Sequence, residues 1–132
     1  MKFCNAQCEA GWTAFQNNCY KFNLGDGSRD NCASICANIP SSAMLCVENS
    51  QQNTFIAGYI SSGAGIWLGV EDPAKNYNWV WRTDCASSYF NWGSGRPNKI
   101  FGTENYVLMK NSGDWLDTGF GFGLTVKCAC QY

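Results

Sequence analysis

The chain has 132 residues, among them 9 cysteines, 6 tryptophans and no histidine, and its formal net charge is −1. This length suits a single sizeable core, so we expect one domain over residues 1–132. The charge balance lacks the basic footprint of a nucleic-acid or anionic-membrane binder, and no apolar stretch approaches the roughly 20 residues of a membrane span. Without histidine the commonest general base is missing, so we do not expect an enzyme.

The cysteine content predicts the compartment. Such a density in a small chain is typical of a disulfide framework formed in an oxidising environment, so we expect a secreted protein. Met1-Lys2-Phe3 leads directly into Cys4 without the apolar region of a signal peptide, which indicates a mature form.

In chain order, the first predicted element is a hairpin between Cys8 and Phe22, in which Tyr20 and Phe22 alternate with polar residues. Ser28 is placed to cap a helix from Arg29 to about Asn38, which Pro40 ends.

Ser50 is a second candidate cap, for a helix that carries Phe55, Ile56, Tyr59 and Ile60. Four apolar runs beyond it predict strands: Ile66–Val70, Trp79–Trp81, Tyr106–Met109 and Leu124–Cys128. The segment from Asp84 to Thr103 has little periodicity, and a loop of that length in a compact domain is usually functional. The predicted class is α+β, with two helices flanking antiparallel sheets and one long irregular loop.

The loop and the residues after it carry three polar motifs: Arg96-Pro97-Asn98, Glu104-Asn105 and Trp115-Leu116-Asp117. Their order and spacing resemble the sugar-binding loop of C-type lectins, where Glu-Pro-Asn or Gln-Pro-Asp, a Glu-Asn/Asp pair and Trp-Asn-Asp gather around calcium. Further marks follow the family order, from Cys8…Trp12…Cys19-Tyr20 through Ile66-Trp67-Leu68-Gly69 and Asn91-Trp92 to Cys128. The resemblance covers nearly the whole chain and implies a C-type lectin-like fold.

Arg96 stands where the family has a calcium ligand, and Leu116 replaces a second ligand. Calcium takes roughly six to eight oxygen ligands, whereas a guanidinium offers donors only. We therefore expect neither calcium nor any other metal or cofactor in the sugar site. Arg96 is instead expected to pair with Glu104 or Asp117 and so hold the loop.

The resemblance implies disulfides Cys8–Cys19 and Cys36–Cys128. Cys32 lies one helical turn before Cys36, and Cys130 lies two residues after Cys128, so a parallel Cys32–Cys130 bridge would fit. Cys46–Cys85 is a weaker pairing, with Cys46–Cys130 as its competitor. Because nine is odd, one thiol is left over, and Cys4 is the candidate for an interchain bridge in a dimer, with a free thiol as the alternative.

Two positions that hold an inner disulfide in the family are Tyr106 and Phe120 here, and an aromatic pair stabilises less than a disulfide does. A four-thiolate zinc site of Cys32, Cys36, Cys128 and Cys130 is a competing interpretation that the oxidising composition disfavours. Asp114 and Asp117 lie too close in sequence to argue for a glycosidase pair.

The resulting hypothesis is a calcium-independent lectin for glycans that end in N-acetylhexosamine (GlcNAc or GalNAc), acting as a disulfide-linked dimer. An acetamido group offers a donor, an acceptor and a methyl, and convergent polar groups with an apolar contact suit it. The predicted sugar-binding residues are Arg96, Asn98, Phe101, Glu104, Asn105 and Asp117. The alternative is a protein-interaction or ice-binding module that kept the scaffold and lost the sugar.

Overall fold

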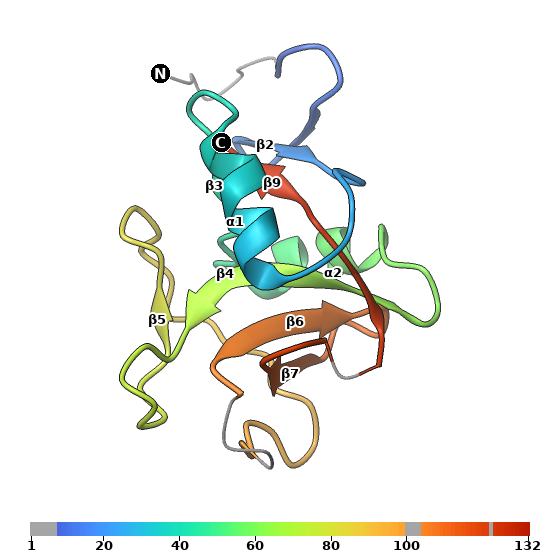
Figure 1. The fold of residues 1–132 in the computed structure, drawn as a ribbon. Helices are drawn as coiled ribbons and strands as arrows, with labels where there is room; N and C mark the ends of the chain where they lie inside the picture. Colours follow the sequence, from blue (N-terminus) through green and yellow to red (C-terminus); the bar gives the residue numbers. More distant parts are fainter. Residues whose placement is uncertain (1–7, 100–103, 122) are drawn as a thin grey trace.

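The structure is a computed structural model that describes residues 8–99, 104–121 and 123–132 (Figure 1). It confirms the predicted α+β class with two helices, antiparallel sheets and disulfide cross-links. Cys4 and Phe101 lie outside the described residues.

A small sheet joins the two ends of the chain. Strands β1 (Thr13–Phe15) and β2 (Asn18–Lys21) form the expected hairpin, β2 pairs with β9 (Cys130–Gln131), and β9 pairs with β3 (Ala43–Met44). All three pairings are antiparallel, and Figure 1 shows this sheet at the top of the molecule beside the C-terminus.

The second sheet has the order β5–β4–β6–β7, with β8 also paired to β4. Its strands are β4 (Ala64–Glu71), β5 (Val80–Trp81), β6 (Tyr106–Lys110), β7 (Trp115–Thr118) and β8 (Thr125–Lys127). Strand β4 is buried from Ala64 to Val70 because neighbouring elements cover both of its faces, which explains its continuous apolar sequence.

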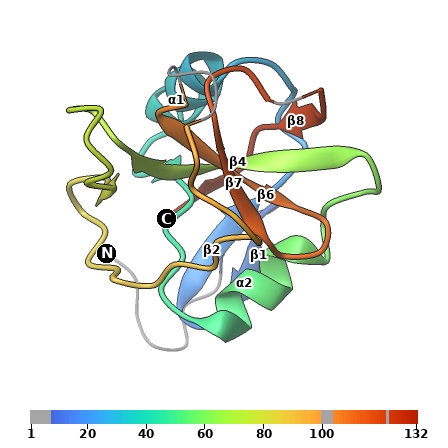
Figure 2. The ribbon, with the colours of Figure 1, turned by 90° about the horizontal axis from the view of Figure 1, so that it is seen from below.

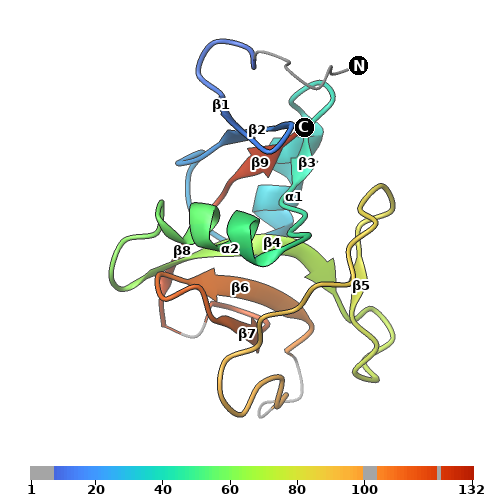
Figure 3. The same ribbon diagram turned by 180° about the vertical axis from the view of Figure 1, so that it is seen from behind.

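Helix α1 (Arg29–Ala37) begins as predicted, since the Ser28 hydroxyl accepts a hydrogen bond from the N–H of Asn31 at 3.1 Å. Helix α2 (Ser50–Ala57) begins one residue earlier than predicted, because its cap is Asn49 and not Ser50, and it ends before Tyr59 and Ile60, which were expected on it. The Asn49 side chain accepts from the N–H of Gln52 at 2.9 Å. Seen from behind, α2 lies beside β4, while α1 stands close to β3 and β9 (Figure 3).

A close backbone approach joins the two sheets at Gly69 of β4. Its N–H donates to the carbonyl of Leu45 at 2.8 Å, and a Cβ at this position would lie 2.8 Å from the same oxygen. Only glycine allows this contact without a shift of the backbone.

Four disulfides are present among the described residues. Cys8–Cys19 and Cys46–Cys85 form as predicted. The other two predicted pairings are wrong, because the bridges are Cys32–Cys128 and Cys36–Cys130. The four thiols that a zinc site would need are consumed by these bridges.

The exchanged pairing has a geometric reason. Four residues of helix rise about 6 Å, and two residues of strand rise about 6.6 Å, so the two cysteine pairs match in length. In the structure, the first cysteine of the helix pairs with the first cysteine of the C-terminal segment, and the second pairs with the second. Helix α1 therefore runs in the same direction as the chain from Cys128 to Cys130. The predicted pairing of Cys36 with Cys128 and of Cys32 with Cys130 would require opposite directions.

The two residues at the inner-disulfide positions have different surroundings. Tyr106 packs edge-on against Trp67, with the guanidinium of Arg29 4.9 Å from its ring centroid. Phe120 is 64% exposed. Tyr106 therefore belongs to the packing between β6 and α1.

Candidate functional site

The long loop is held at its base by one buried carboxylate, that of Asp117 on β7, which has no exposed surface. Its Oδ1 accepts from the N–H of Asn98 at 3.1 Å, and its Oδ2 accepts from the N–H of Lys99 at 2.8 Å. Each of these backbone donors lies close to a charged acceptor, which makes the contacts strong. Asp117 thus fixes the path of residues 96–99 over the end of the second sheet.

Arg96 adds a side-chain cation to the same carboxylate. Its Nη1 lies 3.2 Å from Asp117 Oδ1, 3.2 Å from the Asp117 carbonyl oxygen and 3.2 Å from Asn98 Oδ1. It also lies 3.6 Å from Oε2 of Glu104, which is fully buried. The ion pairs predicted for Arg96 with Glu104 or Asp117 are therefore both present.

A second side-chain cation, Lys99, was not predicted. Its Nζ lies 2.7 Å from Asp72 Oδ2, 2.9 Å from Asn105 Oδ1 and 3.1 Å from the Glu104 carbonyl oxygen. Its ammonium group is thus surrounded by three oxygens, of which two belong to the residues just before β6 and one belongs to the turn after β4.

Two aromatic rings complete the surroundings of this ammonium group. Its Nζ lies 5.3 Å from the ring centroid of Tyr77 and 4.8 Å from that of Trp79, both within the range of cation–π attraction. The Lys99 side chain is only 9% exposed. A single sequence gives little indication that a lysine will be buried in this way. The one available signal was that Lys99 directly follows the Arg96-Pro97-Asn98 motif.

Asp72 connects Lys99 to the turn that follows β4. Its carboxylate is fully buried and accepts from the N–H groups of Tyr77 at 2.7 Å and Asn76 at 3.2 Å. Burial alone would raise the pKa of Asp72, but the hydrogen bond from Lys99, the two backbone donors and the lysine charge together lower the pKa below its usual value. Asp72 is therefore ionised at neutral pH.

The polar residues predicted from the sequence are brought together around these two cations. Asn98 contacts Arg96, Asn105 contacts Lys99, and the carboxylates of Glu104 and Asp117 lie underneath with no exposed surface. Asn98 is exposed, whereas Leu116 is buried. Viewed from below, the loop segment lies across the end of the sheet near β6 and β7 (Figure 2).

Tyr77 is an exposed aromatic residue of the site that sequence reasoning missed. It is 53% exposed, and its hydroxyl lies 3.4 Å from the carbonyl oxygen of Asn98. Its position between two asparagines, in the turn after Pro73, was the available signal. Tyr77 and Asn98 together form an aromatic and polar surface above the buried charges.

The comparisons with known proteins agree with this architecture. Residues 25–120 match the family model of the Lectin C-type domain. The chain therefore belongs to the C-type lectin domain family.

Two curated relatives span most of the chain. Human lithostathine-1-alpha is 29% identical over 129 residues, which cover 95% of this chain and 74% of lithostathine. A C-type lectin of Oxyuranus scutellatus, described as a mannose-binding isoform, is 25% identical over 133 residues, covering 95% of this chain and 84% of the snake lectin.

Three solved structures share the fold. The carbohydrate-recognition domain of cow CD23, solved in the presence of a GlcNAc2Man3 oligosaccharide, has a TM-score of 0.84 at 25% identity, covering 96% of this chain and 95% of its own. C-type lectin CEL-I from Cucumaria echinata has a TM-score of 0.83 at 21% identity, covering 95% and 96%. A calcium-independent type II antifreeze protein has a TM-score of 0.80 at 18% identity, covering 96% and 94%.

Neither helix in the described ranges has the length and apolar composition of a membrane-spanning helix.

Proposed function

We propose that this chain is a lectin that binds carbohydrate at the surface of residues 96–99 without calcium. One observation carries the proposal: the buried carboxylates of Glu104, Asp117 and Asp72 are already paired with the side-chain cations Arg96 and Lys99. Calcium would need roughly six to eight oxygen ligands, and a guanidinium among those oxygens supplies none. These residues do not fit a calcium ion.

The burial of Glu104 and Asp117 changes the roles proposed for them. With no exposed surface and with the loop as their partner, they act by positioning the loop and not by accepting sugar hydroxyls. The ligand surface then consists of the exposed Asn98 side chain and the ring and hydroxyl of Tyr77.

This surface supports a preference for sugars with an N-acetyl group. An amide side chain can both donate to and accept from an acetamido group, and an exposed aromatic ring suits its methyl. We therefore propose terminal GlcNAc or GalNAc as the ligand. The cow CD23 domain, solved with an oligosaccharide that contains GlcNAc, is a relative of the same fold.

Four disulfides support an extracellular location, because such bridges persist in oxidising compartments. They use eight of the 9 cysteines, and the ninth, Cys4, is proposed to link two copies of the chain. Two linked sites would raise the avidity for multivalent glycans above the affinity of one site. Non-reducing electrophoresis distinguishes this dimer from a monomer with a free thiol.

A glycan array probed once with calcium and once with chelator tests the proposed function. We expect the same binding to glycans ending in GlcNAc or GalNAc in both conditions. Binding that disappears only in chelator would contradict the role given to Arg96 and Lys99. Absence of glycan binding in both conditions would favour the alternative of a protein-interaction or ice-binding module.

A further inference from the structure

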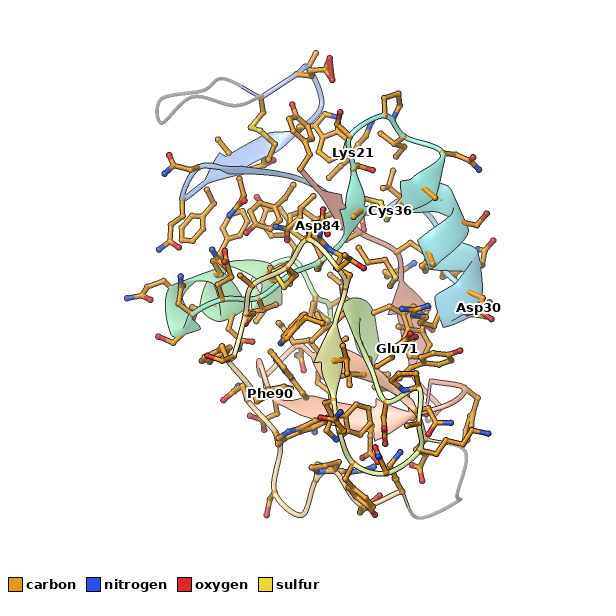
Figure 4. All side chains as sticks on the ribbon, turned by 90° about the vertical axis from the view of Figure 1, so that its left-hand side faces the viewer. Lys21, Asp30, Cys36, Glu71, Asp84 and Phe90 are labelled. Carbon is orange, nitrogen blue, oxygen red and sulfur yellow. A yellow bond between two sulfur atoms is a disulfide. The ribbon has the colours of Figure 1, made fainter. Side chains whose placement is uncertain are left out.

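A solvent-open pocket of about 570 Å³, here called the cavity, lies beside the loop site, between β5 and the chain that follows it. Its walls include Trp79, Trp81, Thr83, Ser88 and Phe90. In Figure 4, β5 faces the viewer and Phe90 and Asp84 are labelled on this part of the chain. The volume falls within the range of small-molecule sites, roughly 300–1,000 Å³.

One wall of the cavity is aromatic and rigid. Trp81 is 8% exposed and packs edge-on against the buried Trp115 at a centroid distance of 5.7 Å. Phe90 is 36% exposed, lies 6.1 Å from Trp81, and stacks nearly parallel to Trp92 at 6.1 Å. The ring of Phe90 is therefore packed against the buried ring of Trp81 and the half-buried ring of Trp92.

The rim of the cavity carries hydroxyl groups that the protein does not use. Thr83 and Ser88 are exposed, and neither side chain makes a hydrogen bond within the described part of the chain. Ser87 differs, since its hydroxyl donates to the Val47 carbonyl and accepts from the N–H of Tyr89. Two hydroxyls beside an aromatic wall are thus available to a ligand.

The indole N–H groups of two lining residues also lack an acceptor. Both Trp79 Nε1 and Trp81 Nε1 are buried, and no atom of the described chain accepts a hydrogen bond from them. Buried donors are almost always paired, so an unpaired one calls for a partner. Both residues line the cavity, so an oxygen of a ligand bound there would supply the missing acceptor.

The cavity carries no unbalanced charge. The only ionic side chain that lines it among the described residues is Arg82, which is paired with the Asp84 carboxylate and donates to the Met44 carbonyl. An ion has no counterion here, and a purely aliphatic molecule would leave the hydroxyls and indole donors without partners. An uncharged ring with one apolar face and several hydroxyls can contact the aromatic wall with that face and form hydrogen bonds to the rim hydroxyls and indole donors with its hydroxyls.

From these observations we infer that the cavity between β5 and Phe90 is a second carbohydrate site, which takes one pyranose unit of a neutral glycan. Its apolar face stacks on Phe90 while its hydroxyls meet Thr83, Ser88 and an indole N–H. Trp79 is shared with the loop site, because its ring also lies 4.8 Å from Lys99 Nζ. The second site needs neither Arg96 nor Asn98, so it stands independently of the function proposed for the loop.

Titration of ¹⁵N-labelled protein with N,N′-diacetylchitobiose, followed by two-dimensional NMR, tests this inference. Saturable shifts of the indole N–H signals of Trp79 and Trp81 are expected, whether or not the amide signals of Tyr77 and Asn98 move. Shifts at Tyr77 and Asn98 alone would support the loop site and overturn the second site. Absence of any shift at Trp81 would overturn it as well.

Ser88→Glu places a charge on the exposed rim, where folding tolerates it, and should weaken binding at this site by roughly tenfold or more. Ser62→Glu is the matched control, since Ser62 is an exposed serine in the turn before β4, and should leave the titration unchanged. Equal affinity of the two variants would contradict the inference. Line broadening at Phe90 that grows with protein concentration and vanishes in Ser88→Glu would also contradict it, since the cavity would then face a second copy.

Discussion

Lys99 Nζ lies 2.7 Å from Asp72 Oδ2, and this buried ion pair joins the long loop to the turn after β4. The two residues are far apart in sequence, and neither belongs to the motif that identified the loop. Their pairing places a second fixed positive charge beside that of Arg96. The loop is thus ordered by the chain's own side chains.

Lys99→Met should destabilise the fold by about 3–5 kcal/mol, because removing one partner of a buried pair leaves an uncompensated charge on Asp72. Urea unfolding measures the free-energy difference. Lys75→Met is the control, since Lys75 is exposed and forms no salt bridge among the described residues; this variant should change stability little. Equal stability of the two variants would show that the Lys99–Asp72 pair does not form in solution.

Arg96→Met should cost more stability than Arg29→Met. Arg96 faces two fully buried carboxylates, whereas Arg29 pairs with Glu71, which is 35% exposed. Buried pairs lose about 3–5 kcal/mol when one partner is removed, and exposed pairs about 0–1 kcal/mol. Thermal or urea unfolding of both variants measures the two losses of stability. A larger loss in Arg29→Met would contradict the role of Arg96 as the partner of the buried carboxylates.

Stability should fall at acid pH partly through Asp72. Its pKa is lower in the folded chain than in the unfolded chain, where it is about 3.9. The stability that this shift contributes is therefore complete above the unfolded pKa and is lost as the pH falls through the folded pKa. Asp72→Asn should flatten the dependence of unfolding free energy on pH between about 5 and 2, and an unchanged slope would speak against the ionised, paired carboxylate.

Disulfide connectivity can be tested with two double variants. Cys32→Ser with Cys128→Ser removes one bridge and should leave no additional free thiol. Cys32→Ser with Cys130→Ser breaks both bridges and leaves Cys36 and Cys128 without their partners.

Thiol titration and thermal unfolding should find the first variant more stable. Its remaining bridge still closes nearly the same long loop, so it should lose less than the roughly 2–4 kcal/mol typical of one disulfide. The opposite order would restore the pairing of Cys36 with Cys128.

The sequence was informative where the signal was local. The cap at Ser28 and the β4 strand followed from the local residue pattern, and the gathering of Arg96, Asn98, Glu104 and Asp117 followed from the resemblance to the sugar-binding loop of C-type lectins. Strand β7 gave no alternation, because all of its residues are buried.

What remained hidden depended on how distant elements lie against each other. The relative direction of α1 and the chain from Cys128 to Cys130 decides the disulfide pairing, and no local pattern encodes it. Lys99 finds its partner Asp72 only after the loop folds back on the turn following β4. The exposure of Tyr77 likewise depends on the packing of that turn.

The proposed ligand surface makes its own prediction. Tyr77→Ala should weaken binding of a GlcNAc or GalNAc glycoside by about 1–2 kcal/mol or more, since aromatic residues often dominate binding energy, while stability changes little. Tyr59→Ala is the matched control, because Tyr59 is 43% exposed and stacks on Phe22 away from the loop. Calorimetric titration of both variants with the glycoside provides the comparison.

We propose that Arg96 and Lys99 take the place of bound cations in the loop. The most direct measurement is the melting temperature of the wild-type protein in millimolar calcium and in chelator. A ligand present at 100 times its dissociation constant would stabilise the fold by about 2.7 kcal/mol. We expect the same melting temperature in both conditions; a saturable rise with calcium that depends on Asn98 and Glu104 would contradict the claim.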